Sequence, residues 1–168
     1  MVTTTVADAR AIAQTVTDPE LPMLTLHDLG VLRGVHVDGG RVTVELTPTY
    51  SGCPAMAEMR ADVVAKLRAA GYRDVDVLTV LSPPWTTDDI TAHGRRVLAE
   101  HGIAPPGPAP RRMPGPVPLT LGAPPPRVAC PQCGSPDTER VSQFGSTSCK
   151  SLHRCLPCGE PFEHVKAH

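Results

Sequence analysis

Two pairs of cysteines near the C-terminus limit the possible folds of this chain more than any other feature. They lie in Cys130-Pro-Gln-Cys133-Gly and Cys155-Leu-Pro-Cys158-Gly, and residues 134–154 separate them. This spacing slightly exceeds the usual window of about 15–20 residues for a two-knuckle zinc site. A tetrahedral ion takes four thiolates at about 2.3 Å, and two such turns supply them. The glycine after each pair allows a positive φ. The pattern predicts a C-terminal zinc β-ribbon with four ligands: Cys130, Cys133, Cys155 and Cys158.

Other uses of these cysteines remain open. Iron is the second ion that four thiolates suit. Disulfides would require a secreted protein, but residues 1–14 show no apolar core after a basic start, so we expect no signal peptide and a reducing cytoplasm. Cys149 precedes the second pair and could replace one ligand, approach a second metal, face a partner or take no part in binding.

Half of the 20 prolines fall in residues 103–127. Proline lacks the backbone N–H and fixes φ, so this segment is expected to be an extended spacer. The sequence therefore predicts three parts, with a small α/β domain over residues 1–102, a proline-rich linker over 103–127 and the ribbon over 128–168.

Residues 1–102 show alternating helical and strand patterns. Apolar residues recur at helical spacing over residues 5–16, and Val42, Val44 and Leu46 alternate with polar residues as in a half-buried strand. Asp38-Gly39-Gly40 is a hairpin signal between two strands. We expect an α+β fold, an αββαβα domain with a three-stranded mixed sheet followed by the ribbon. The expected helices are 5–16, 54–70 and one capped by Thr87 that ends at Gly102, and the expected strands are 29–37, 41–47 and 73–81. Trp85 is expected to close the core of this domain.

Composition argues against two classes of partner. The formal net charge is −1, so no global positive field holds nucleic acid. No apolar run is long enough to span a membrane. We therefore expect neither nucleic-acid nor membrane binding, while assembly with further copies of the chain stays open.

Cys53 is the candidate reactive residue of the first domain. It follows Gly52 between a strand and a helix, and Pro54 suits the first helical position, which would place Cys53 at the N-cap. Amide groups and the helix dipole favour a thiolate there, although a free cysteine also serves as a small buried apolar residue. Asp18 and Glu20 form a second polar cluster, either a capped turn or carboxylates that contact a metal or partner beside Cys53.

Several segments together carry motifs of a known family. They are residues 18–22, 29–30, 47–54 and 82–86 in the first half, and residues 130–135, 142–150 and 158–162 in the tail. Through these segments, the first half is similar to the iron–sulfur assembly domain of SufT-like proteins, and the tail resembles the zinc ribbon of the PaaD (PaaJ) family.

This resemblance implies an accessory subunit rather than an enzyme. It implies a maturation factor for the multicomponent phenylacetyl-CoA 1,2-epoxidase of aerobic phenylacetate catabolism, which helps to assemble an iron–sulfur cluster or metal centre in the reductase or oxygenase subunit. Cys53 carries over as the family's candidate reactive cysteine, and iron or a transient cluster would pass through the protein. No catalysis is expected from this chain alone.

Two alternative functions stay open. The first is electron transfer, because two Cys-x-x-Cys-Gly turns also hold the single iron of rubredoxin-like proteins. The second is an adaptor in which the ribbon binds protein or nucleic acid. Basic and acidic residues nearly balance over residues 127–168, so contact with a nucleic-acid backbone is expected to be weak.

Overall fold

The computed structural model describes residues 5–50, 52–109 and 127–167. The chain divides into two compact units, residues 1–97 and residues 98–168. Among the described helices, none combines the length and the apolar character that a membrane crossing requires.

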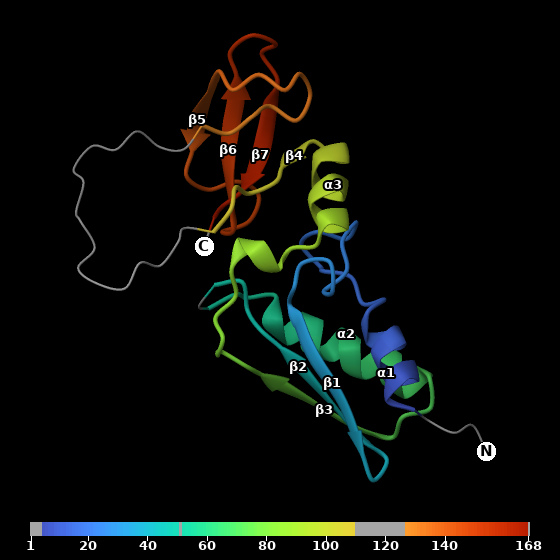
Figure 1. Cartoon of the computed structure of the whole chain (residues 1–168). Coiled ribbons are helices and arrows are strands. Elements are labelled where there is room, and N and C mark those ends of the chain that lie inside the picture. Colours follow the sequence, from blue (N-terminus) through green and yellow to red (C-terminus); the bar gives the residue numbers. More distant parts are fainter. Residues whose placement is uncertain (1–4, 51, 110–126, 168) are drawn as a thin grey trace. The chain divides into compact units, whose positions relative to one another are not determined.

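The first unit has the predicted αββαβα order around a three-stranded mixed sheet (Figure 1). The sheet order is β1-β2-β3; β1 pairs with β2 antiparallel and β2 pairs with β3 parallel. The predicted fold class is therefore confirmed. The elements are α1 (Val6–Ala13), β1 (Leu32–Asp38), β2 (Arg41–Leu46), α2 (Met56–Ala69), β3 (Asp74–Thr79), the 3-10 helix η1 (Thr87–Asp89) and α3 (Ala92–Glu100).

The core of this unit lies where α1 and α2 pack against each other and against the sheet. Strand β2 buries every second side chain, Val42, Val44 and Leu46, as its sequence alternation predicts. Trp85 is buried and its indole Nε1–H donates to the Leu29 carbonyl at 2.8 Å. The predicted role of Trp85 in closing the core is confirmed.

Two predicted helix starts are wrong. Helix α2 begins at Met56 with Ala55 as N-cap, so Cys53 is not the cap; the Met56 N–H instead donates to the Cys53 carbonyl at 3.4 Å in a turn that delays the helix. Thr87 does not cap the last helix, because it lies buried inside η1. Thr91 takes that role, and its hydroxyl accepts from the Gly94 N–H at 2.9 Å.

Gly30 lies where β1 is about to begin and η1 comes close to the backbone. Its φ is +69°, and a β-carbon there would stand 2.5 Å from the Asp89 carbonyl oxygen. The Asp89 carboxylate in turn accepts hydrogen bonds from Arg33 Nη1 at 3.0 Å and Arg33 Nη2 at 3.1 Å. Glycine is thus required at this contact, which joins η1 to the first strand.

The second unit contains a four-stranded sheet with order β4-β7-β6-β5 (Figure 1). Strand β4 pairs with β7 in parallel, while β7 with β6 and β6 with β5 are antiparallel. A small apolar core lies against the sheet, formed by Ala104, Val128, Cys130, Cys155 and Phe162. The strands are β4 (Ile103–Ala104), β5 (Thr138–Ser142), β6 (Lys150–Cys155) and β7 (Pro161–Val165).

Strand β4 lies inside the range predicted for the linker. Ile103 and Ala104 are both buried and pair with Glu163 and His164 of β7. Residues 110–126, which hold most of the predicted linker, lie outside the described residues. The domain boundaries 1–102, 103–127 and 128–168 therefore stay a prediction.

Candidate metal centre

Both Cys-x-x-Cys segments form the same turn. The Gly134 N–H donates to the Cys130 carbonyl at 2.8 Å, and the Gly159 N–H donates to the Cys155 carbonyl at 2.9 Å. The two glycines have φ of +72° and +78°, as the pattern predicts. One turn lies before β5 and the other follows β6, so the β5–β6 pairing brings them together.

The four sulfurs of these turns converge on one point. The Sγ atoms of Cys130, Cys133, Cys155 and Cys158 all lie within 4.8 Å of one another. The Cys130–Cys158 distance is 3.8 Å and the Cys133–Cys155 distance is 3.5 Å. A tetrahedral ion with bonds of about 2.3 Å requires sulfurs about 3.8 Å apart, so this donor set fits zinc or a single iron.

Electrostatics in the cluster also favours a cation. Burial opposes ionisation of Cys130, but the N–H groups of Cys133 and Gln132 stabilise its thiolate and lower the pKa to about 7. The Cys158 N–H favours the Cys155 thiolate too, yet burial and the three neighbouring thiols raise its pKa to about 12. Four thiolates at these distances repel one another, and a divalent ion removes that repulsion.

Cys149 lies outside this four-sulfur cluster. Its thiol is half-buried and lies 3.1 Å from the Thr147 hydroxyl, and its carbonyl accepts from the Lys166 N–H. None of the six cysteines, which all fall within the described ranges, forms a disulfide.

The polar residues predicted for a site in the first unit are not gathered into a metal site. Asp18 is buried, and its Oδ1 accepts from the N–H groups of Glu20 and Leu21, both at 2.8 Å, so its carboxylate caps a turn. Cys53 and Glu20 are half-buried. Across the described ranges, the ribbon cysteines are the only group of three or more potential metal ligands within 4.8 Å of one another.

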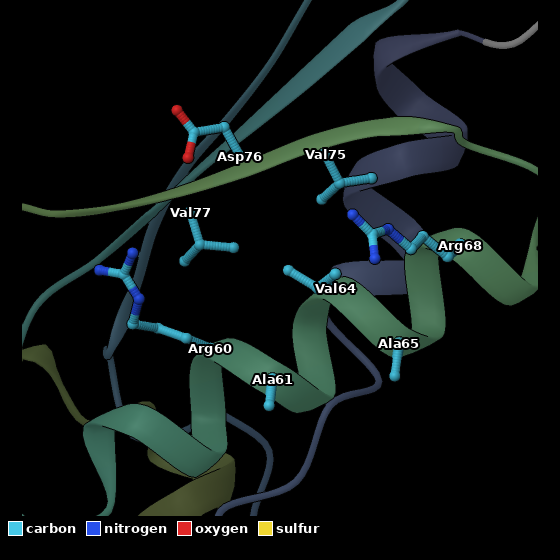
Figure 2. Close-up of a pocket in the computed structure, with 8 residues that line it drawn as sticks. All are labelled: Arg60, Ala61, Val64, Ala65, Arg68, Val75, Asp76 and Val77. Atoms are coloured by element: carbon cyan, nitrogen blue, oxygen red, sulfur yellow. The ribbon is translucent and has the colours of Figure 1, made fainter.

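A groove of about 420 Å³ lies in the first unit between α2 and β3 (Figure 2). Its lining combines apolar side chains, such as Val64 of α2 and Val77 of β3, with Arg60 and Arg68 of α2. Arg60 also donates to the Thr79 hydroxyl at 3.0 Å. Asp76 of β3 is the one carboxylate in its lining, none of the lining residues is a cysteine or histidine, and the three polar residues predicted for this unit lie outside it, so the groove gathers no group of metal ligands.

The second unit holds a polar cluster that sequence reasoning missed. Ser151 and His153 are buried in β6, and the Ser151 hydroxyl lies 3.0 Å from His153 Nε2 and 3.4 Å from His164 Nδ1 of β7. The two-residue spacing of Ser151 and His153 signals that they share one face of a strand. The approach of His164 depends on the β6–β7 register, which no local pattern shows.

Comparison with known proteins covers both halves of the chain. Residues 114–166 match the family model described as the PaaD zinc beta ribbon domain, and residues 7–79 match that of the iron–sulfur cluster assembly protein. A protein of Escherichia coli (strain K12), provisionally named as one of the subunits of 1,2-phenylacetyl-CoA epoxidase, is 40% identical over 156 residues, covering 93% of this chain and 89% of the relative.

Two further similarities concern the first half alone. The Fe-S protein maturation auxiliary factor SufT of Staphylococcus aureus (strain USA300) is 37% identical over 86 residues, which are 49% of this chain and 96% of the relative. The crystal structure of a domain of unknown function, DUF59, from Bacillus anthracis superimposes with a TM-score of 0.51 at 25% identity, covering 55% of this chain and 90% of that one. The resemblance seen in the sequence is thus confirmed, and this chain belongs to the PaaD family, in which an iron–sulfur cluster assembly domain precedes a zinc β-ribbon.

Proposed function

We propose that this chain is an accessory maturation factor of the phenylacetyl-CoA 1,2-epoxidase of phenylacetate catabolism. It assists assembly of an iron–sulfur cluster or metal centre in a partner subunit and does not turn over the epoxidase substrate itself. The observation that carries this proposal is similarity along nearly the whole chain, 40% identity over 93% of its length, to a protein named as an epoxidase subunit. The similarity of the first half to a named Fe-S maturation factor supports the assembly role.

The ribbon is assigned a structural zinc ion held by Cys130, Cys133, Cys155 and Cys158. Four thiolates complete a tetrahedron and leave no coordination position for a substrate, which is typical of structural zinc. The ion supplies folding energy to a unit whose apolar core is small. A single iron would fit the same sulfurs and would favour electron transfer instead. Elemental analysis and the visible spectrum separate the two, because iron–thiolate centres are coloured and zinc is not.

Cys53 is the residue we assign to transfer of iron or a cluster to the client. It lies in the turn between β2 and α2, within the segment that matches the assembly family, and its side chain is half-buried. The Asp18 carboxylate is committed to its turn by two N–H donors, so we do not give it a ligand role. Glu20, half-buried beside that turn, stays a candidate contact for the client. We expect this transfer to the client to take place in the cytoplasm, where thiols stay reduced.

The test uses the epoxidase reductase and oxygenase expressed with the wild-type chain, with Cys53→Ser, with Cys149→Ser or without the chain. Iron and acid-labile sulfide per purified client subunit are measured. We expect Cys53→Ser to lower loading to the level seen without the chain, because serine is not a soft ligand at neutral pH. Cys149→Ser, the matched half-buried cysteine outside the cluster, should support full loading.

The two parts of this proposal fail separately. Full loading of both subunits in cells that lack the chain would refute the maturation role. Full loading with Cys53→Ser, when cells without the chain show a deficit, would refute only the role of Cys53. The zinc content of the variant chain, purified from the same cells, shows whether the ribbon is intact.

A further inference from the structure

One face of the ribbon sheet carries a row of buried polar side chains that a metal-binding role does not use. Ser151 and His153 of β6 are only 4% and 6% exposed. The register places Ser151 opposite His164 and His153 opposite Phe162 of β7. Burial of polar groups in so small a unit costs free energy unless they are hydrogen-bonded. The hydrogen-bond partners of these side chains therefore have to be accounted for.

The hydrogen bonds within this row are incomplete. The Ser151 hydroxyl lies 3.0 Å from His153 Nε2 and 3.4 Å from His164 Nδ1, but it has one proton and can donate to one ring at a time. Among the described residues, His153 Nδ1 and His164 Nε2 have no hydrogen-bond partner. Each ring therefore keeps one nitrogen for a ligand or for water.

A cavity of about 260 Å³ opens beside these rings, and its lining is basic. Arg127, Arg140 and Lys166 line it, and no described lining residue is acidic. The Lys166 ammonium already donates to the Ser148 carbonyl at 2.8 Å and lies 4.2 Å from the centre of the Phe144 ring, so its charge is fixed near the cavity. Acidic and basic residues nearly balance over the ribbon sequence, but the fold places three cations at this one cavity.

The acidic residues that adjoin the cavity residues Arg140 and His164 in sequence form ion pairs with other residues. Glu139 forms an ion pair with Arg154 at 3.4 Å, and Glu163 forms one with the buried Lys150 at 2.8 Å. By contrast, neither Arg127 nor Arg140 forms a hydrogen bond or ion pair with its side chain to another residue in the described ranges. Two guanidinium groups thus remain available to a ligand.

The rings of His153 and His164 line the cavity, and each can offer an N–H from the ring nitrogen that has no partner among the described residues. The positive charge of the cavity comes from the arginines and the lysine. Such a partly desolvated, cationic cavity with several N–H donors favours an oxyanion.

We propose that this cavity binds a phosphate group, with Arg127 and Arg140 as its principal ligands and His153 and His164 as further hydrogen-bond donors. Two guanidinium forks and a nearby ammonium match a doubly charged oxyanion better than a single carboxylate. The volume of about 260 Å³ lies just below the roughly 300–1,000 Å³ of pockets that bury drug-sized ligands, so a phosphate with a small attached group fits.

The test uses the zinc-loaded full chain near neutral pH and at constant ionic strength. Imidazole resonances of His153 and His164 are followed by NMR while inorganic phosphate, glycerol 3-phosphate or acetate is added. We expect both phosphates to cause saturable shifts and acetate to bind more weakly. Tighter binding of glycerol 3-phosphate would assign the site to a phosphomonoester, and tighter binding of inorganic phosphate would assign it to the free anion.

A matched pair of arginine variants shows whether Arg140 binds phosphate in this cavity. Arg140→Gln should weaken phosphate binding about 10- to 100-fold, as expected for loss of a charge-assisted hydrogen bond. Arg154→Gln removes an arginine from the neighbouring strand that is paired with Glu139 instead and should bind like the wild type. Zinc content and dispersed ribbon resonances establish that each variant is folded. Unsaturable shifts in the wild type, equal binding of acetate, or equal weakening by both variants would overturn the proposal.

Discussion

Cys155→Ser is expected to release the metal and unfold the ribbon while the first unit stays folded. Cys155 is one of two buried thiols in the four-sulfur cluster, and it also belongs to the apolar core. Structural zinc contributes about 10–16 kcal/mol to small zinc domains, whereas the whole net stability of a domain is about 5–15 kcal/mol. The core cluster holds five residues in the part of the ribbon unit that the structure describes, so loss of even half of the metal contribution is expected to exceed the stability that remains.

The assay combines metal content with residue-resolved NMR. Zinc per chain is measured by mass spectrometry, and amide resonances of β5–β7 are expected to collapse to unfolded positions while those of β1–β3 stay dispersed. Chelation of the wild-type metal should give the same spectrum, and added zinc should reverse it. Cys149→Ser, whose sulfur lies outside the cluster, should keep its zinc. A Cys155→Ser protein with one four-sulfur zinc and dispersed ribbon amides would refute the ligand assignment.

Three further predictions concern the first unit and are read from unfolding curves. Trp85→Phe leaves a buried carbonyl without its 2.8 Å donor and should cost about 1–3 kcal/mol; an unchanged curve would contradict this. Burial opposes ionisation of Asp89, but the Arg33 guanidinium and the Thr86 N–H hold the pKa of that carboxyl below its usual value, so its stabilisation is present above the usual pKa and is lost as pH falls through the folded pKa. Asp89→Asn should remove that acid-induced loss. A variant whose free energy of unfolding changes with pH as in the wild type would contradict this prediction. Gly30→Ala should destabilise more than Gly39→Ala, since both have positive φ but only Gly30 would meet backbone at 2.5 Å; equal losses would disprove the close-contact argument.

Local rules were enough to predict most elements and the metal cluster. The hairpin of β1 and β2 follows from Asp38-Gly39-Gly40 between two apolar segments, because that turn chemistry fixes the pairing. The conformation of each Cys-x-x-Cys-Gly turn also follows from its sequence, since each glycine closes the same backbone bond, whereas the convergence of the four sulfurs further requires the β5–β6 pairing. The interactions within the turns lie within a few residues of the signal.

The predictions that failed or were missed depend on distant parts of the chain. The start of α2 depends on how the turn after β2 uses the Met56 N–H, and Pro54 alone does not determine that. Strand β4 has two residues, and its partner β7 lies far along the sequence, so no local pattern marks it. The cluster of Ser151, His153 and His164 likewise requires the β6–β7 register, which only the folded sheet fixes.

The pairing of β4 with β7 changes what the proline-rich sequence connects. The division between the two units falls at Val97 and Leu98, within α3, so the chain between Ala104 and Val128 begins and ends in the same unit. In connectivity, the two described flanks of this segment therefore belong to the ribbon unit. Loop-closure entropy grows slowly, by about 0.6 kcal/mol for each doubling of a flexible loop, and prolines reduce the freedom that closure removes. The connection can consequently vary in length at small cost to the ribbon, while its prolines limit the entropy lost when β4 joins the sheet.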